Sequence, residues 1–338
     1  AIPVNNTEEL KEKIRQEEFT DDNGKKLEVT QIEEVEKLDG HEKTQALKVY
    51  TQIPPNIPKI EKQVYEMPET KACREYDIPF YKRYLIDQKI RPVKTIQIEG
   101  KEVENEDFDK AIEIESVEQS EDAEIEFEKL AFDLEVYQDE IIIASFASEN
   151  YTKLLTTEEI DRESVEVVEN EKHLLKRLIE IVNERDVDIL TGYNTDEYDF
   201  QRLRERCEKH GMELSLGRDG ERMKFKRRGR FSGARLKGRM HLDLYPFIEH
   251  ILAPGIDSET LDLDSVAEEM LGSNKDDMTW EEMKESWRKK EDLEEFADYA
   301  LKDAELAYEL AEEIMPQMLE LAQITGLTPF DVCRLTYG

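Results

Sequence analysis

Alternating apolar and polar positions predict a pair of strands near the middle of this 338-residue chain, over residues 130–137 and 141–148. Apolar side chains then recur at helical spacing in residues 171–185. Further strands are predicted at 187–193 and 240–245, and helices at 197–210, near 246–252, at 262–271 and from about 291 to 314. Strands that alternate with helices predict an α/β fold, in which helices cover the faces of a sheet.

The first 128 residues have a different pattern. Residues 7–18 predict a short helix with Thr7 as its N-cap, and residues 45–53 predict a strand. Residues 99–128 hold fourteen acidic residues and two lysines, which indicates an exposed hairpin or a partly disordered insertion, with a solvated linker as the alternative. We therefore expect a smaller α+β N-terminal domain over 1–128, a second domain over 129–314, and a C-terminal segment over 315–338 that packs on the N-terminal domain.

The charge of the chain is strongly acidic. Its 82 Asp and Glu against 47 Lys and Arg give a formal net charge of −35. Three interpretations are open: work at high salt, acidity confined to tails and insertions, or avoidance of nucleic acid. The last predicts that no cluster of basic residues exists.

The three cysteines, Cys73, Cys207 and Cys333, lie far apart and form no CxxC pair. They support neither a disulfide framework nor a zinc ribbon, so a reduced, intracellular protein is expected. The sequence shows no apolar run of 18 residues and no signal-peptide pattern, so we expect no membrane partner and a cytoplasmic location.

Asp133 and Glu135 are two positions apart in a predicted strand, so their side chains project from the same face. A solvated pair is the commoner explanation. The alternative is a divalent metal site, in which a cation removes the repulsion between neighbouring carboxylates.

Two further groups favour the metal site. Asn194, Asp196 and Asp199 crowd the junction of a strand and a helix, and Tyr299 and Asp303 share a helix face at i and i+4. If Asp133, Glu135, Asp199 and Asp303 meet at one sheet edge, only metal ions would make the cluster stable. Oxygen ligands suit Mg²⁺ or Mn²⁺, and two such ions are the usual arrangement for phosphodiester cleavage. Tyr299 would orient the attacking water, since a phenol of pKa about 10 is no base at neutral pH.

The ordered motifs FDLE (132–135), YNTDEYDF (193–200) and YALKD (299–303) resemble the three exonuclease motifs of family B DNA polymerases. Similarity to archaeal members extends over nearly the whole chain, through EYDIPFYKRYLID (75–87), LGRDG (216–220), KGRMHLDLYPFI (237–248) and DVCRLTYG (331–338). The polymerase palm, fingers and thumb are not part of this sequence.

The resemblance implies a ribonuclease H-like domain that proofreads single-stranded 3′ ends in the 3′→5′ direction with two Mg²⁺ (or Mn²⁺) ions. It assigns Asp133, Glu135, Asp199 and Asp303 as metal ligands and Tyr299 as the water-positioning group. Asp199 rather than Asp196 is the second-motif carboxylate, because it follows Tyr198, and Asn194 and Tyr198 would contact the substrate. Val136 stands where the family usually has threonine.

The resemblance also implies partners. These are primer–template DNA, the palm, fingers and thumb in the same or a second polypeptide, and a sliding clamp, in a nucleoid-associated, prokaryotic setting.

Residues 222–239 reverse the local charge, with nine basic residues and no acid. Gly229 and Gly233 predict a hairpin, and Phe225 and Phe231 interleave with cations, a composition that suits single-stranded nucleic acid. A solvated basic loop is the alternative. The candidate DNA contacts are Arg222, Lys224, Lys226, Arg227, Arg228 and Arg230. The nearby DLYPF (243–247) resembles a palm motif, but no DTD follows, so we interpret Asp243 as a structural residue at a strand end.

Archaeal relatives carry a pocket that senses uracil in the template, and the matching positions here are Ile57, Ile78, Pro79, Phe80 and Arg83. Ordinary packing is the alternative for the four apolar residues. Two other functions stay open for the chain: a free-standing exonuclease of the ribonuclease D kind, and an inactive nuclease fold that binds DNA as a scaffold of a split polymerase.

Overall fold

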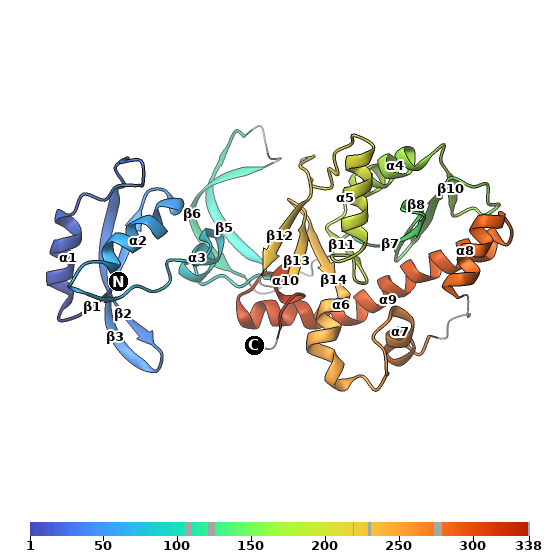
Figure 1. Ribbon diagram of the computed structural model, residues 1–338. Coiled ribbons are helices and arrows are strands. Elements are labelled where there is room, and N and C mark those ends of the chain that lie inside the picture. The colour runs from blue at the N-terminus through green and yellow to red at the C-terminus, as the bar shows by residue number, and fades with distance from the viewer. Residues whose placement is uncertain are drawn as a thin grey trace. The chain divides into compact units, whose positions relative to one another are not determined.

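The computed structural model describes all residues except 106, 107, 109, 121–125, 219, 229, 230, 274–278, 337 and 338. The chain divides into two compact units, Ala1–Lys89 and Ile90–Gly338, each with its own hydrophobic core (Figure 1). No described helix has the length and apolarity needed to span a membrane.

The N-terminal unit is a small α+β arrangement. Its elements are β1 (Ile2–Pro3), α1 (Thr7–Gln16), β2 (Val29–Asp39), β3 (Glu42–Thr51), the 3₁₀-helix η1 (Pro54–Asn56), α2 (Ile57–Tyr65), β4 (Thr70–Ala72) and α3 (Phe80–Asp87). The predicted helix and strand near its start are confirmed, but Asn6 rather than Thr7 caps α1 by accepting the Glu9 N–H. Leu10 and Ile14, one turn apart on α1, pack into the core of this unit.

The second unit is built on a six-stranded sheet in the order β10-β9-β8-β7-β11-β14. The strands are β7 (Lys129–Tyr137), β8 (Glu140–Ser148), β9 (Tyr151–Thr156), β10 (Val165–Val167), β11 (Ile189–Gly192) and β14 (Met240–Asp243). β7, β8 and β9 pair antiparallel, whereas β11 joins β7 and β14 in parallel. The carboxyl ends of β11 and β14 therefore lie at the same edge, and the loop after β11 is placed there.

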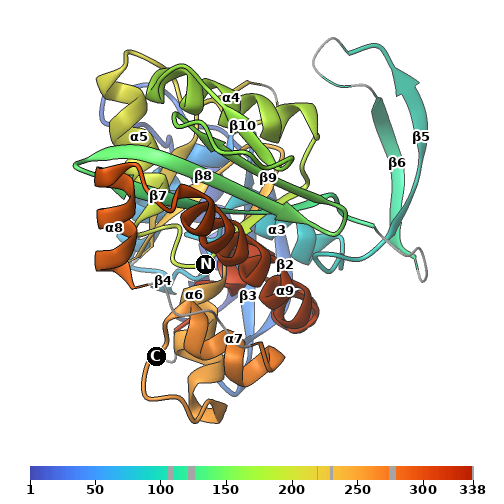
Figure 2. The same cartoon turned by 90° about the vertical axis from the view of Figure 1, so that its right-hand side faces the viewer.

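Helices cover both faces of this sheet (Figure 2). One face packs against α4 (Glu171–Glu184) and α5 (Asp199–Lys209), and the other against the long helix α9 (Leu293–Thr325). α9 is longer than the predicted helix and runs without interruption through residue 314. The predicted α/β class is confirmed.

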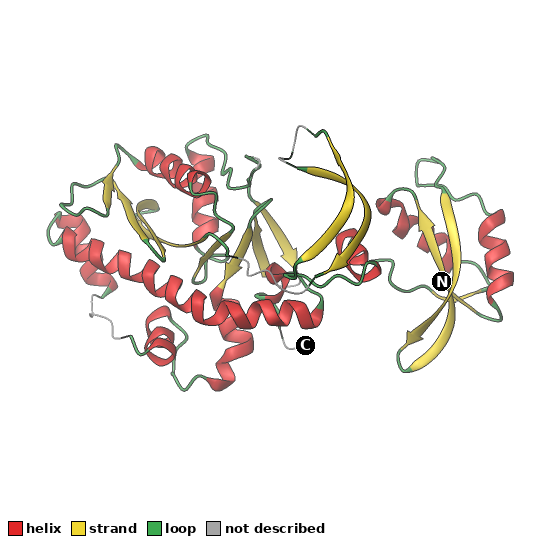
Figure 3. Cartoon of the chain, turned by 180° about the vertical axis from the view of Figure 1, so that it is seen from behind, coloured by secondary structure: helices red, strands yellow, loops and turns green. Residues whose placement is uncertain are grey.

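The remaining helical segments follow β14 in the chain, and Figure 3 shows the helices in red. They are α6 (Leu244–Phe247), the π-helical turn Ile248–Leu252, the 3₁₀ turn Ala253–Gly255, α7 (Leu263–Leu271), α8 (Trp280–Lys289), which the sequence pattern missed, and α10 (Pro329–Val332).

The acidic segment forms a hairpin of β5 (Ile96–Val103) and β6 (Ala111–Gln119), as one of the predictions had it. The two compact units divide before this hairpin, at Lys89, whereas the predicted N-terminal domain extends to residue 128. In the C-terminal segment, α10 packs on α9 and β14. The segment also contacts residues of the predicted N-terminal domain, since Arg91 Nη1 donates to the backbone oxygens of Gln323 and Ile324.

Candidate active site

The side chains of β7 alternate between the two faces of the sheet, which pack against different helices. Leu130, Phe132 and Leu134 join the core cluster beneath α4 and α5, where Phe132 stacks edge-on against Phe200 at 5.3 Å. Asp133 and Glu135 take the opposite parity and therefore project from the face that α9 covers. The two carboxylates on one strand face are thus directed at a helix, not at open solvent.

Asp303 on α9 completes a carboxylate cluster with Asp133 and Glu135. One carboxylate oxygen of each lies within 4.8 Å of the others. Glu135 is buried, and Asp133 and Asp303 are half-buried. Two like charges 4 Å apart repel by about 4 kcal/mol at an effective dielectric constant of 20. The cluster therefore favours either proton uptake or a bound divalent cation.

Asp199, at the first turn of α5, is the fourth carboxylate. It is 2% exposed, and its Oδ1 has no hydrogen-bond partner among the described residues. Burial, followed by the charges of Asp133, Asp243 and Glu135, raises the pKa of Asp199 well above its ordinary value. The charges of Asp133 and Glu135 act on Asp199, but Asp199 is not one of the three carboxylates that lie within 4.8 Å of one another. A buried carboxylate oxygen without a partner suits a hard cation such as Mg²⁺, which takes oxygen ligands.

Tyr299 lies one turn before Asp303 on α9 and is half-buried against the core cluster that contains Phe296 and Ala300. Residues four apart on a helix share a face, so Tyr299 lies on the same side of α9 as Asp303.

Asp243, at the end of β14, holds the loop that precedes Asp199. It is fully buried, and its carboxylate accepts hydrogen bonds from the backbone N–H groups of Asn194 (2.8 Å), Asp196 (2.9 Å) and Tyr245 (3.1 Å). Burial and the neighbouring Asp196 raise the pKa of Asp243 to about 7. The interpretation of Asp243 as a structural residue at a strand end is confirmed. Asn194, predicted to contact substrate, has a left-handed backbone (φ 61°).

Asp196 forms a buried ion pair with Arg334. Its Oδ2 accepts from Arg334 Nε at 2.6 Å, and its Oδ1 accepts from the Ala234 N–H at 2.7 Å. Both members of the ion pair are about 5% exposed. Asp196 is therefore committed to a buried ion pair, and Asp199 is the loop carboxylate that faces the cluster.

The basic stretch forms a hairpin of β12 (Lys224–Arg228) and β13 (Phe231–Arg235). Its charges are partly neutralised, because Arg222 pairs with Glu213 and Lys224 lies 3.5 Å from Glu221. Phe225 packs against the core beneath Arg204, so its ring already has a cation partner.

The structure describes the side chains of only some of the remaining residues that were predicted to contact DNA. Lys226 is half-buried on β12, and Tyr198 is 41% exposed with its ring 5.7 Å from the Arg202 guanidinium. Arg230 lies outside the described residues, as do the side chains of Arg227, Arg228 and Phe231.

The predicted base-sensing residues all lie in the N-terminal unit. Phe80 is 63% exposed and Pro79 is also exposed, whereas Ile57, Ile78 and Arg83 are half-buried. Arg83 forms ion pairs with Glu75 and Asp87. The base-sensing pocket stays a prediction.

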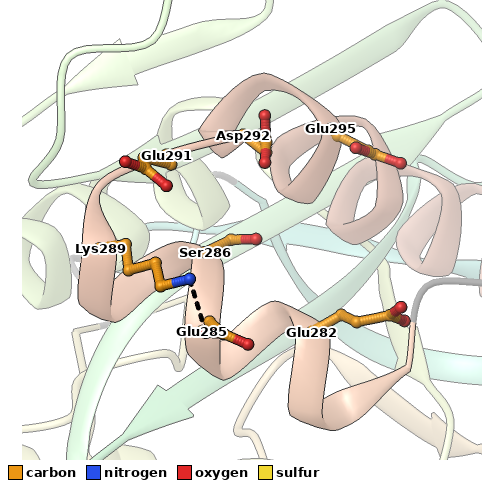
Figure 4. A pocket seen from close by; sticks show the side chains of 7 residues that line it. All are labelled: Glu282, Glu285, Ser286, Lys289, Glu291, Asp292 and Glu295. Atoms are coloured by element: carbon orange, nitrogen blue, oxygen red, sulfur yellow. Dashed lines mark ion pairs between the residues drawn. The ribbon is translucent and has the colours of Figure 1, made fainter.

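A separate hollow of about 280 Å³ lies at the turn between α8 and α9 (Figure 4). Five of its seven lining residues are acidic, and Lys289 pairs with Glu285 at 2.6 Å. None of the predicted site residues lines it, and its charge would repel a nucleic acid.

Sequence reasoning missed the part of the site that surrounds Asp196. His241 is buried, with Nε2 2.8 Å from Thr195 Oγ1 and Nδ1 2.9 Å from Arg334 Nη2. Burial lowers the pKa of His241 to about 4, so the ring is neutral at pH 7. The signals in the sequence were the motifs DVCRLTYG, which contains Arg334, and KGRMHLDLYPFI, which contains His241, but neither indicated that the two residues meet.

Comparisons with known proteins agree with this geometry. A model of the DNA polymerase family B exonuclease domain matches residues 71–266. DNA polymerase 1 of Pyrococcus abyssi is 34% identical over 323 residues, covering 93% of this chain and 38% of the relative. The DNA polymerase of Thermococcus kodakarensis is 34% identical over 318 residues, covering 92% of this chain and 17% of the relative.

The solved structures give the same fold. The family B DNA polymerase of Pyrobaculum calidifontis superposes with a TM-score of 0.79 at 21% identity, over 98% of this chain and 42% of that one. This chain thus spans well under half the length of the polymerases it matches. The exonuclease domain of family B DNA polymerases is a 3′→5′ exonuclease with a ribonuclease H-like fold. The match over residues 71–266, together with the cluster of Asp133, Glu135 and Asp303, shows that the chain belongs to DNA polymerase family B and carries the exonuclease domain of that family.

Proposed function

We propose that this chain is the 3′→5′ proofreading exonuclease portion of a family B DNA polymerase and removes nucleotides from single-stranded 3′ ends. The observation that carries the proposal is the meeting of Asp133, Glu135 and Asp303 within 4.8 Å, and the buried Asp199, on which the charges of Asp133 and Glu135 act, supports it. Surface acids spread apart to lower their repulsion, so convergence under a helix points to a ligand set.

Asp133, Glu135, Asp199 and Asp303 would hold Mg²⁺ or Mn²⁺, two ions in the usual arrangement. When bound, such ions activate a water and stabilise the departing oxygen. The unpartnered Oδ1 of Asp199 supports this fit. Tyr299, on the same face of α9 as Asp303, would orient the water through its phenol.

The chain's other residues would bind and orient the strand. Asn194 and Tyr198 lie on the loop and helix start that carry Asp199, so they would contact the terminal nucleotide. Arg222, Lys224 and Lys226, with Arg227, Arg228 and Arg230, would contact the backbone of primer–template DNA. The palm, fingers and thumb, on the same or a second polypeptide, and a sliding clamp are the further partners we propose.

A single-turnover assay tests the proposal. Chain in excess over a fluorescent single-stranded DNA with Mg²⁺ should shorten the strand from its 3′ end, and EDTA should stop the reaction. The Asp133→Asn/Glu135→Gln variant removes two charges from the cluster and should abolish shortening. The matched control, Asp139→Asn/Glu140→Gln, removes two charges from the exposed β7–β8 turn and should retain it.

Two outcomes of this assay would favour a different function for the chain. A preference for RNA over DNA would favour an exonuclease of the ribonuclease D kind. Intact DNA under every salt and metal condition, with retained DNA binding, would favour the inactive scaffold.

A further inference from the structure

Arg334 lies far along the chain from the exonuclease motifs, yet it is 5% exposed inside the second unit. It follows α10, in the turn that packs on β14. A buried arginine is costly unless its charge is balanced, and here the balancing group is Asp196, 138 residues away.

Each polar group of Arg334 has a partner. Nε donates to Asp196 Oδ2 at 2.6 Å, and Nη1 donates to the backbone oxygens of Phe330 (2.8 Å) and His241 (3.3 Å). Nη2 lies 2.9 Å from His241 Nδ1, and the guanidinium stacks 4.0 Å from the centre of the Phe330 ring. The side chain therefore has one orientation, which is set from α10 and β14.

Gly233 on β13 supports the same conclusion independently. A Cβ at this glycine would lie 2.5 Å from Arg334 Nε and 3.0 Å from Phe330 Cζ. The guanidinium thus passes directly over the strand backbone, and any side chain at position 233 would displace it from Asp196.

Arg334 is connected to Asp199 through Asp196 and the backbone hydrogen bonds of the loop that carries both aspartates. Asp196 anchors its loop through the backbone, since its N–H donates to Asp243 and its C=O accepts from Gln201 Nε2 at 3.1 Å. The neighbouring Thr195 C=O accepts the Phe200 N–H at 2.9 Å, next to Asp199. Holding Asp196 in place therefore fixes the start of α5, from which Asp199 projects.

We propose that Arg334 is a positioning residue of the exonuclease site: by balancing Asp196, it holds the 194–199 loop and the start of α5, from which Asp199 projects. The inference rests on the proposed function and extends it, since it makes the segment after α9 a part of what positions the metal site. Groups that hydrogen-bond directly to metal ligands typically control metal affinity or activity by about 10–100-fold, and Arg334 acts on Asp199 indirectly, through Asp196, so we expect the lower end of that range.

The test compares Arg334→Met with the wild-type chain by two measurements, at a temperature where circular dichroism shows both folded. We expect the single-turnover rate on single-stranded DNA to fall about tenfold or more, and Mn²⁺ affinity, measured by electron paramagnetic resonance, to weaken about tenfold. Asp196→Asn/Arg334→Met leaves neither charge buried alone, and we expect it to recover most of both losses.

Arg206→Met is the matched control, because Arg206 is equally buried and pairs with the buried Glu171, away from the loop. We expect it to lower Tm while the folded protein keeps its rate and Mn²⁺ affinity. Wild-type rate and affinity in folded Arg334→Met would overturn the proposal.

The measurements still test the role of Arg334 in two further cases. If Arg334→Met does not fold, Gly233→Ala replaces it, and weakened Mn²⁺ binding supports the positioning role while unchanged binding overturns it. If the wild-type chain leaves DNA intact, the proposed exonuclease function fails, and the Mn²⁺ comparison still decides the role of Arg334.

Discussion

Asp196 and Asp199 lie three residues apart, and the same substitution at each should change stability in opposite directions. Asp199 is buried with an unpartnered Oδ1 among like charges, whereas Asp196 is buried in an ion pair with Arg334. Asp199→Asn removes a carboxyl group whose ionisation the metal-free fold opposes. Asp196→Asn removes the charge that balances a buried guanidinium.

The structure sets the magnitudes. Two unit charges 4 Å apart repel by about 4 kcal/mol at an effective dielectric constant of 20, and protonation relieves part of this cost, so Asp199→Asn should raise the free energy of unfolding in EDTA by about 1–3 kcal/mol. For a unit of this size, Tm should rise by about 2–4 °C per kcal/mol. Breaking a buried ion pair costs about 3–5 kcal/mol, so Asp196→Asn should lower Tm by a larger amount.

The pH dependence has a defined sign. The folded-state pKa of Asp199 is raised, so the folded protein holds a proton that the unfolded chain releases. In EDTA, the wild-type chain should gain stability as pH falls through that raised pKa, and Asp199→Asn should lack this gain. Differential scanning calorimetry in EDTA, and again with Mg²⁺, measures both effects. With Mg²⁺, the wild-type chain should gain more than the variant. A lower Tm for Asp199→Asn in EDTA would refute the account of the site as a repelling cluster.

Three other predictions concern neighbouring features. Glu171→Gln should cost about 3–5 kcal/mol in urea unfolding at pH 7, because Glu171 balances the buried Arg206. Burial opposes ionisation of Glu171, but Arg206 and His210 lower its pKa overall, so the ionised carboxylate stabilises the fold above its ordinary pKa. The difference in unfolding free energy between wild type and Glu171→Gln should therefore shrink as the pH falls through the lowered pKa. A difference that does not change with pH would contradict this. Gly192→Ala places a Cβ 2.5 Å from Thr195 Cγ2 and 2.7 Å from the Phe132 backbone oxygen, so Tm should fall by the equivalent of about 1–3 kcal/mol. Gly211→Ala is the control: no atom lies within 4 Å of its Cβ, so it measures the cost of backbone strain alone. Lys224→Ala/Lys226→Ala should reduce the salt dependence of single-stranded DNA binding, measured by fluorescence anisotropy, by about 1.4 in log–log slope; an unchanged slope would exclude both lysines as phosphate contacts.

The sequence predicted the central strands well, because β7 and β8 have strong patterns of their own. It predicted α8 and the end of α9 poorly. α9 continues to Thr325 because one face of its later turns packs, at Leu310, Ile314 and Met318, into the cluster shared with β14. By its contacts the acidic hairpin belongs to the second unit, which an acidic composition alone does not indicate.

The sequence by itself determined that Asp133 and Glu135 share a strand face, that Tyr299 and Asp303 share a helix face, and that these motifs occur in the order typical of family B exonuclease domains. Periodicity is a local property, so it reports which residues share a face but not what covers that face. Only the tertiary structure decided that α9 lies over β7, that Asp199 is buried beside the other carboxylates, and that Asp196 is balanced by Arg334. The Asp196–Arg334 contact joins residues 138 positions apart, and packing rather than local pattern determines which distant residues meet.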